Sequence, residues 1–203
     1  MLEFIADTHT YKKDGVVIPS VTQIIGEWQL TEVYGVEYYY NIYSGAVLAA
    51  DRFTEARDFG RAAHAMNALY LMGSLDQSAL HPSLIPVLDQ FDTWLRTFNV
   101  EPVLIETPLY SEKHQYAGTP DLVCLVKKRL AIVDYKTGDY AMAGPQLAGY
   151  DQLYKPKIYK QRFVLYLPKD GGQFKFVPCT NYSDDWKFFY SRLYQYHYLK
   201  GLK

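Results

Sequence analysis

The chain has few of the features that mark several specialised protein classes. Its two cysteines, Cys124 and Cys179, are too few for a disulfide framework or for four thiolates around zinc or an iron–sulfur cluster. No apolar stretch approaches the roughly 18 residues that a membrane-spanning helix needs. Residues 1–15 lack the basic-then-apolar layout of a signal peptide. We therefore expect no membrane partner and a soluble protein of a reducing cytoplasm.

An excess of one charge sign is also missing. The chain has 21 Lys and Arg against 22 Asp and Glu, a formal net charge of -1, which argues against a blanket coat for a polyanion but allows a local basic groove. Internal repeats, low-complexity segments and long linkers are not visible either. With 49% hydrophobic and 21% charged residues the composition is that of a globular protein. Residues 1–203 are therefore expected to form a single domain.

Tyrosine, in contrast, is abundant, with 20 copies in 203 residues. Its large apolar ring and polar tip suit half-buried positions, so one interpretation is a tyrosine-rich core and rim. The other interpretation is a surface on which nucleic-acid bases stack. Composition alone does not choose between the two.

The first 100 residues carry mainly helical signals and form an expected N-terminal helical part. Residues 2–18 look like two short strands around a Lys-Asp-Gly turn. Ser20, with Gln23 three positions later, forms a capping-box pattern that predicts a short helix ending near Gly26. Residues 27–43 are aromatic and match no single pattern. Helical composition follows in two stretches: 44–72, with a break near Asp58-Phe59-Gly60, and Pro82–Phe98.

The pattern changes after residue 100 to strands that alternate with helices. The expected strands are Val103–Tyr110, Leu122–Val126, Leu130–Tyr135, Arg162–Leu167 and Gln173–Pro178, the last two joined as a hairpin. The expected helices cover residues 142–154 and 184–198. This order predicts an α/β (mixed α+β) fold with helices packed on a mixed sheet. Within it, a catalytic core would cover about residues 101–180 and a C-terminal helix about 184–200.

Two aspartates are expected to face each other across a hairpin. If Val126 pairs with Arg129 across a two-residue turn, Asp121 lies directly opposite Asp134. Opposed residues are about 4.5–5.5 Å apart, and like charges there repel. A hard divalent cation would remove the repulsion, because Mg²⁺ and Mn²⁺ favour carboxylate oxygens.

Lys136 is expected on the same face as Asp134, because side chains two apart on a strand point the same way. It would then hold a metal-bound hydroxide or a developing charge on phosphate. The alternative is an ordinary cross-strand ion pair, since an isolated Asp-x-Lys is common. An apolar strand that runs directly into the charged triplet favours the functional interpretation.

Four stretches together carry a family resemblance: Pro120-Asp121, Asp134-Tyr135-Lys136, Gln146 to Tyr150, and Gly60 to His64. In this combination the chain resembles the PD-(D/E)xK nuclease superfamily and its RecB-like exonuclease branch. Residues 18–25 look like the entry segment of phage-type and mitochondrial genome-maintenance exonucleases. The resemblance covers roughly residues 16–167. It implies a restriction-endonuclease-like core, with a central mixed β-sheet flanked by helices.

The resemblance implies a role for each matching residue. Lys136 would activate or orient the attacking water, and Gln146 and Tyr150 would position both Lys136 and the substrate phosphate. Glu106 would support a second cation through water. One or two Mg²⁺ or Mn²⁺ ions would be held by His64, Asp121, Asp134 and the Tyr135 carbonyl.

Each of these assignments has a purely structural alternative. His64 could be a hydrogen-bonded core histidine, and Gln146 and Tyr150 could form a helix face that packs on the sheet. The chain also departs from the family pattern, because residues 67–69 lack the glutamate that many relatives carry after the helix histidine, which leaves a second cation open. The four cysteines of some relatives are absent, so no iron–sulfur cluster is expected.

Local cations are candidates for binding DNA, although a solvated lysine loop is the alternative for the second group. One group, residues 127–129, lies at a hairpin tip, and Arg61 lies close to His64. The second group is interleaved with Tyr154 and Tyr159, a mixture that suits a strand with exposed bases, and consists of Lys155, Lys157, Lys160 and Arg162.

These patterns predict a metal-dependent DNA exonuclease that hydrolyses phosphodiester bonds with a metal-activated water. By analogy, a stand-alone phage or mobile-element gene product is expected, which if phage-encoded would act in the bacterial host cytoplasm. Its expected substrate is single-stranded DNA or duplex ends. Two alternatives remain: a structure-specific or restriction-type endonuclease with the same core, and a catalytically silent DNA-binding accessory protein. A zinc enzyme is not supported by the spacing of His and Cys.

Overall fold

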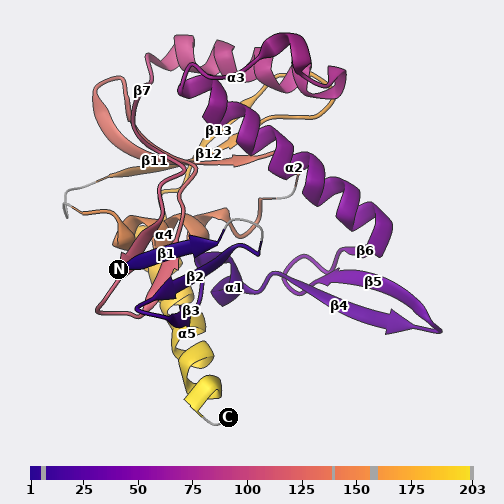
Figure 1. The fold of residues 1–203 in the computed structure, drawn as a ribbon, viewed down its shortest axis with the longest axis vertical. Helices are drawn as coiled ribbons and strands as arrows, with labels where there is room; N and C mark the ends of the chain where they lie inside the picture. Colours follow the sequence, from indigo (N-terminus) through magenta and orange to yellow (C-terminus); the bar gives the residue numbers. More distant parts are fainter. Residues whose placement is uncertain (6–7, 139, 156–159, 202–203) are drawn as a thin grey trace.

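A five-stranded mixed sheet forms the centre of the computed structural model, which describes residues 1–5, 8–138, 140–155 and 160–201 (Figure 1). Its strand order is β13-β12-β11-β10-β7. β11 and β12 are parallel, and the other neighbours are antiparallel. The strands are β7 (Glu101–Ile105), β10 (Leu122–Val126), β11 (Arg129–Lys136), β12 (Gln161–Tyr166) and β13 (Lys175–Pro178). The expectation of a mixed sheet with helices packed on it is confirmed.

The β10–β11 hairpin has the predicted register. Val126 pairs with Arg129, and Leu122 pairs with Val133. Lys127 and Lys128 form the two-residue turn with φ of 48° and 66°, the left-handed conformation that matches the twist of a tight hairpin. This register determines which residues leave the two strands at the same level.

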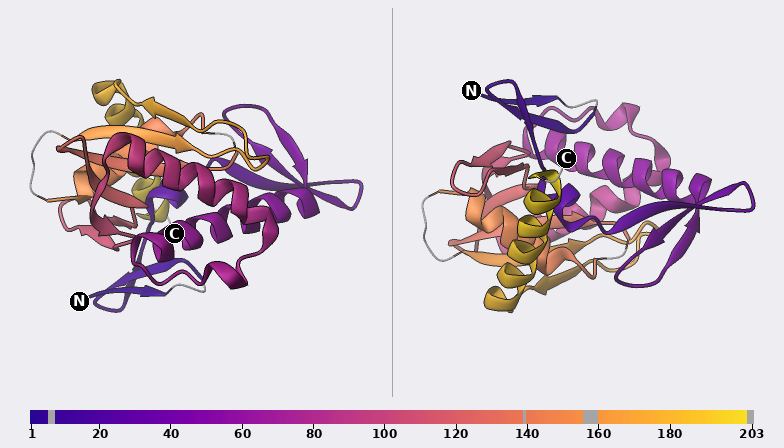
Figure 2. Two further views of the ribbon diagram at one scale, coloured as in Figure 1. Left: turned by 90° about the horizontal axis from the view of Figure 1, so that it is seen from above. Right: turned by 90° about the horizontal axis from the view of Figure 1, so that it is seen from below.

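Helices cover both faces of the sheet. α2 (Ala50–Leu71) and α3 (Ile85–Phe98) pack on one face, and α1 (Val21–Ile25), α4 (Ala143–Leu153) and α5 (Tyr182–Gly201) pack on the other (Figures 1 and 2). α4 connects β11 to β12, as a parallel pair requires a crossover. Among the described residues, no helix combines the length and the apolar character needed to cross a bilayer.

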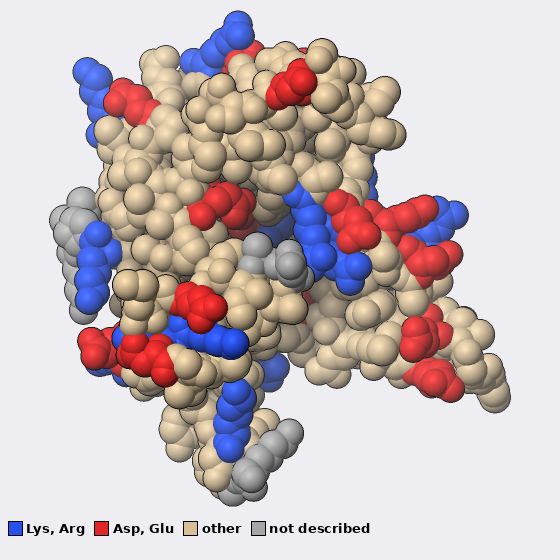
Figure 3. Space-filling model, viewed as in Figure 1, with Lys and Arg blue, Asp and Glu red and all other residues tan. Residues whose placement is uncertain are grey.

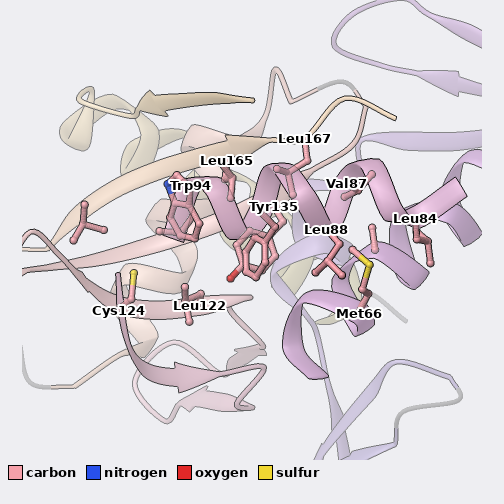
Figure 4. Close-up of a cluster of buried hydrophobic side chains, with 14 of the residues drawn as sticks. Met66, Leu84, Val87, Leu88, Trp94, Leu122, Cys124, Tyr135, Leu165 and Leu167 are labelled. Atoms are coloured by element: carbon pink, nitrogen blue, oxygen red, sulfur yellow. The ribbon is translucent and has the colours of Figure 1, made fainter. Parts of the chain in front are cut away.

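Each face of the sheet contributes its own core. On the α2–α3 face, Trp94 is fully buried against Tyr135 of β11 (Figure 4), and Phe91 packs against the same tyrosine ring. On the opposite face, Ile132 and Val123 pack with α4 and α5. Tyr135 therefore points away from Asp134 and Lys136, as the period of two along a strand predicts.

Local signals predicted the boundaries of most helices. The Ser20 side chain accepts a hydrogen bond from the Gln23 amide at 3.1 Å, and the Gln23 side chain accepts one from the Ser20 amide at 3.0 Å, so the expected capping box is present. α1 ends at Ile25, and Gly26 caps it in the left-handed conformation with φ of 58°, as expected. The expected helix at Pro82–Phe98 is α3 preceded by a short 3₁₀ turn, η2 (Pro82–Leu84), with a second such turn, η1 (Gln77–Ala79), before it.

The expected helix over residues 44–72 was wrong in two respects. α2 begins only at Ala50, because residues 47–49 form β6 (Val47–Ala49). The helix also runs without a break through Gly60, since one glycine costs a helix only about 1 kcal/mol and packing on the sheet outweighs it.

Within the described residues, three small sheets accompany the central one, and their strands divide segments for which the sequence predicted fewer strands. Residues 2–18 form three strands rather than two: β1 (Leu2–Ile5), β2 (Thr10–Lys13) and β3 (Val16–Ile18). The expected strand at 103–110 is split between β7 and β8 (Leu109–Ser111), which pairs with β9 (Tyr116–Gly118). The split occurs at Glu106, whose φ of 41° ends the extended conformation.

The aromatic segment that matched no pattern forms an arm. β4 (Trp28–Val33) and β5 (Val36–Asn41) make a long hairpin that, with β6, projects from the body (Figures 1 and 2). Tyr39 of β5 stacks on Phe53 of α2 with ring centroids 3.8 Å apart, which attaches the arm to the helix. The N-terminal part of the chain therefore contributes strands as well as the expected helices.

Candidate active site

Three carboxylates form a row across three neighbouring strands, β7, β10 and β11, near one end of each. Leu122 of β10 pairs with Ile105 of β7 and with Val133 of β11. An acidic residue adjoins each paired position on the same side: Glu106 follows Ile105 and Asp134 follows Val133, whereas Asp121 precedes Leu122 because β10 runs antiparallel to both neighbours. Asp121 is 7% exposed and Asp134 is 1% exposed. The sheet therefore concentrates negative charge near one end of these strands, where Asp121 and Asp134 are buried and Glu106 is partly exposed.

His64 approaches this row from α2. Its Nδ1 lies 3.1 Å from Asp121 Oδ1, and its Nε2 lies 2.9 Å from the Tyr135 carbonyl oxygen. The Tyr135 amide donates a hydrogen bond to Asp121 Oδ2 at 2.6 Å. Asp121 is consequently fixed through both of its oxygens, and His64 is hydrogen-bonded at the edge of a cleft.

The ligand atoms of three side chains lie close enough to share a cation. One nitrogen of His64 and one oxygen each of Glu106 and Asp121 are within 4.8 Å of one another. Glu106, expected only as a support, thus belongs to this group. Asp134 is paired differently, since its Oδ2 lies 2.7 Å from Lys136 Nζ. An imidazole with carboxylates suits a divalent ion such as Mn²⁺, so this donor set fits the expected cofactor.

A chain of hydrogen bonds holds Lys136 from the other side. Its ammonium donates to Gln146 Oε1 at 3.0 Å, and Gln146 Nε2 donates to the Tyr150 hydroxyl at 3.1 Å. Gln146 and Tyr150 lie one turn apart on α4 and so share a face. The predicted proximity of these three residues is confirmed, and Asp134 completes the surroundings of the ammonium.

The acids in the site lie so close together that they shift one another's pKa values. Burial raises the pKa of Asp134 to about 6, although Lys136 opposes the shift. Burial and the neighbouring Asp121 charge raise the pKa of Glu106 to about 7. Burial lowers the pKa of His64, but the Asp121 carboxylate outweighs it and the pKa rises to about 9. A bound cation would relieve the repulsion that these acids impose on one another.

Opposing effects of burial and neighbouring charge also act on Lys136, and they leave its amine protonated. Burial lowers the pKa of its amine, but the Asp134 carboxylate outweighs burial, and the pKa lies above its ordinary value. Burial raises the pKa of Asp121 in turn, but the His64 charge outweighs it, so the carboxyl is a stronger acid than usual. Lys136 is thus a positively charged ammonium next to Asp134, one member of the row of acids.

A cleft of about 520 Å³ opens onto these groups. Figure 3 shows acidic and basic side chains side by side in the recess at the centre of one face. The predicted residues that line this cleft are Arg61, His64, Glu106, Asp121, Asp134, Lys136, Gln146 and Tyr150. One residue of the predicted set, Tyr135, takes part through its carbonyl bond to His64.

Other cleft residues were missed in the sequence. His9 follows β1 at a left-handed position with φ of 48°, and Thr22 belongs to α1. Arg57 lies one helical turn before Arg61. His9 lies outside every motif, and no local pattern marks it. Thr22 lies within residues 18–25, the stretch that resembles an exonuclease entry segment, although nothing in that stretch singles out Thr22 as a cleft residue. The four-residue spacing of Arg57 and Arg61 was a further signal.

The structure corrects the expected role of two cations. Lys160 is 4% exposed, and its ammonium lies 3.0 Å from Asp151 Oδ1. Arg162 is 2% exposed and lies 2.9 Å from Asp185 Oδ2. Burial beneath α4 and α5 leaves neither group a surface for a DNA phosphate. Lys155 is exposed, and Lys157 lies outside the described residues.

Comparison with known proteins adds no family to this geometry. The chain matches no model of a protein family and none of the curated proteins. The arrangement of side chains described above is accordingly the basis for assigning a function.

Proposed function

We propose that the chain is a divalent-metal-dependent DNA exonuclease with the core of the PD-(D/E)xK nucleases. The observation that carries this proposal is the row of Glu106, Asp121 and Asp134 across β7, β10 and β11, with Lys136 beside it. Crowded carboxylates are costly unless positive charge compensates them. His64 and Lys136 pair with Asp121 and Asp134, and a divalent cation would compensate the remaining charge, that of Glu106 included. A site that hydrolyses a phosphodiester with a bound cation accounts for this arrangement.

The cation would be held by His64, Glu106 and Asp121, with Asp134 and the Tyr135 carbonyl as the further ligands that the family resemblance implies. This assignment is supported by the closeness of the first three donors, within 4.8 Å of one another. A bound Mg²⁺ or Mn²⁺ supplies charge stabilisation to the phosphate and makes water a better nucleophile near neutral pH.

Lys136 acts as a fixed positive charge. Its ammonium is held by Asp134 at 2.7 Å and by Gln146 at 3.0 Å, and its pKa stays above the ordinary value. It therefore donates hydrogen bonds to the phosphate and the attacking water, and does not serve as a general base. Tyr150 holds Gln146 and thereby keeps the ammonium in place.

The reaction is hydrolysis of one ester bond of the DNA backbone. The water oxygen bonds to phosphorus, the bond from phosphorus to one ester oxygen breaks, and the proton lost by water ends on the leaving oxygen. Lys136 stabilises the added negative charge on the phosphate oxygens. Arg61, exposed at the rim of the cleft, is placed to contact a neighbouring phosphate.

The test compares linear and covalently closed DNA. Purified protein is incubated with end-labelled linear DNA and with a closed circle, in Mg²⁺, in Mn²⁺ and in excess EDTA. We expect nucleotide release from the linear substrate with either metal, no release in EDTA, and no cutting of the circle. Cutting of the circle would establish an endonuclease instead. A purified protein that leaves all substrates intact with both metals would contradict a nuclease.

A further inference from the structure

The active-site cleft continues into a larger one. A cleft of about 910 Å³ shares His9, Thr22, Arg57, Arg61, Lys136 and Gln146 with the first. From there it extends to Trp28 at the base of the arm, Phe53 of α2 and Tyr196 of α5. A ligand seated at the acid row therefore has a continuous path toward the arm.

One face of α2 lines this path. Phe53, Arg57, Arg61 and His64 are spaced by four, four and three residues, so their side chains lie along one stripe of the helix. At a rise of about 1.5 Å per residue, the stripe is roughly 16 Å long from Phe53 to His64. In order from the site it presents an imidazole, two guanidinium groups and an aromatic ring.

The far end of the path is an aromatic platform. Trp28 and Phe53 both line the cleft, with ring centroids 5.2 Å apart. Tyr39 stacks on Phe53 at 3.8 Å and at an interplanar angle of 14°. The three rings come from β4, β5 and α2, so they hold one another in place. All three rings remain partly exposed.

The two arginines are available to anions. Arg57 contacts Asp58 at 3.1 Å, but both side chains are solvent-exposed, so the pair adds little. Among the residues that the structure describes, none forms an ion pair with Arg61. The acid on the cleft wall, Glu27, accepts a hydrogen bond from Asn41 Nδ2 at 2.9 Å.

We propose that this extension binds a single-stranded stretch of DNA, and the proposal rests on the proposed nuclease function. Two neighbouring phosphates lie on Arg61 and Arg57, and the base beyond them stacks on Trp28 and Phe53. Along the helix axis the arginines are about 6 Å apart, comparable to successive phosphates of an extended strand. In a duplex the bases stack on one another, so their faces are not available to the platform. The site therefore selects single strands.

Binding without cleavage tests this directly. Fluorescein-labelled oligothymidylate of 12 nucleotides and a hairpin duplex of equal length are titrated in EDTA and followed by anisotropy. We expect the single strand to bind more tightly and to quench tryptophan fluorescence. Trp28→Leu, which keeps an apolar side chain, should weaken single-strand binding by about 5- to 100-fold and remove most of the quenching.

Arg61→Ala tests the phosphate contact separately. It should reduce the slope of log affinity against log salt by about 0.7. The matched controls are Tyr40→Ala, an exposed arm tyrosine outside the cleft, and Arg52→Ala, an exposed α2 arginine off the stripe. Both should bind like the parent. Circular dichroism of Trp28→Leu shows whether the fold is retained. Because Arg61 is exposed, Arg61→Ala is not expected to change the fold.

The outcomes separate this proposal from the nuclease function. Equal affinity for single strand and duplex, or unchanged binding in both Trp28→Leu and Arg61→Ala, would overturn the single-strand site. If the parent still cleaved DNA in that case, the proposed nuclease function would stand. Selective binding that Trp28→Leu weakens, in a parent that cleaves nothing, would support the site and reject the nuclease.

Discussion

Gly118 lies against Tyr150 so closely that a β-carbon on residue 118 would be 2.8 Å from Tyr150 Cε1. It would also be 2.9 Å from Val21 Cγ2, so the new atom would be trapped between two buried side chains. The Tyr150 hydroxyl in turn accepts a hydrogen bond from Gln146, which accepts one from the Lys136 ammonium. The missing side chain at residue 118 thus permits the packing that positions the ammonium.

Gly118→Ala is therefore expected to displace Tyr150. Overpacking of this kind costs about 1–3 kcal/mol, so urea unfolding should show a loss of stability in that range. DNA cleavage should fall by at least about 10-fold because Lys136 loses its support. Gly138→Ala is the control, since a β-carbon there meets no atom within 4 Å. Parent-like cleavage by Gly118→Ala would contradict the role of the chain of hydrogen bonds.

Gln146→Ala removes the middle of that chain and leaves the fold little affected, because Gln146 is only partly buried. A hydrogen bond to a charged group is worth about 1.5–3 kcal/mol. If it acts on the transition state, kcat should fall by roughly 10- to 100-fold while KM changes little. Steady-state kinetics on a short single strand measures both. A change confined to KM would show that Gln146 binds substrate and does not position Lys136.

Binding of Mn²⁺ should stabilise the protein against heat. At a concentration 100 times the Kd, binding contributes about 2.7 kcal/mol, which for a chain of this size raises the Tm by about 5–10 °C. Because Glu106 belongs to the ligand group, Glu106→Gln should lose most of this shift. Asp89→Asn, an exposed acid on α3, should keep it. A full shift in Glu106→Gln would return Glu106 to the supporting role expected from the sequence.

The burial of Arg162 leads to a prediction about stability and not about DNA. Its guanidinium pairs with Asp185 and lies 4.2 Å from the centre of the Tyr182 ring. Removing one partner of a buried ion pair costs about 3–5 kcal/mol, so Arg162→Ala should unfold at much lower urea. Lys155→Ala, at an exposed position of the same cluster, should not. Equal stability of the two variants, with weaker DNA binding by Arg162→Ala, would restore the original expectation.

Local rules in the sequence were sufficient for part of the fold and of the site. The turn between Val126 and Arg129 determined the hairpin register and so the level of Asp121 and Asp134. Helical spacing placed Gln146 and Tyr150 on one face. In each case the relationship depends on residues that are neighbours in the sequence or joined by a short turn.

Other features depend on packing between distant segments. Glu106 joins the ligand group because β7 pairs with β10, and no local pattern predicts that pairing. Arg162 looked like a surface cation because its partner Asp185 is 23 residues away. The arm mixes tyrosine, glutamate and apolar residues, and its position depends on stacking against α2. The sequence pattern thus predicted the individual helices and strands better than it predicted which of them pack together.

The central claim is that the row of Glu106, Asp121 and Asp134 carries metal-dependent hydrolysis of DNA. Its most direct test is the rate of nucleotide release from end-labelled DNA in Mn²⁺ by Asp134→Asn beside Asp89→Asn, both checked for native circular dichroism. We predict that Asp134→Asn releases nucleotides at least about 1,000-fold more slowly than the parent, and that Asp89→Asn matches the parent. Equal rates for all three proteins would contradict the claim.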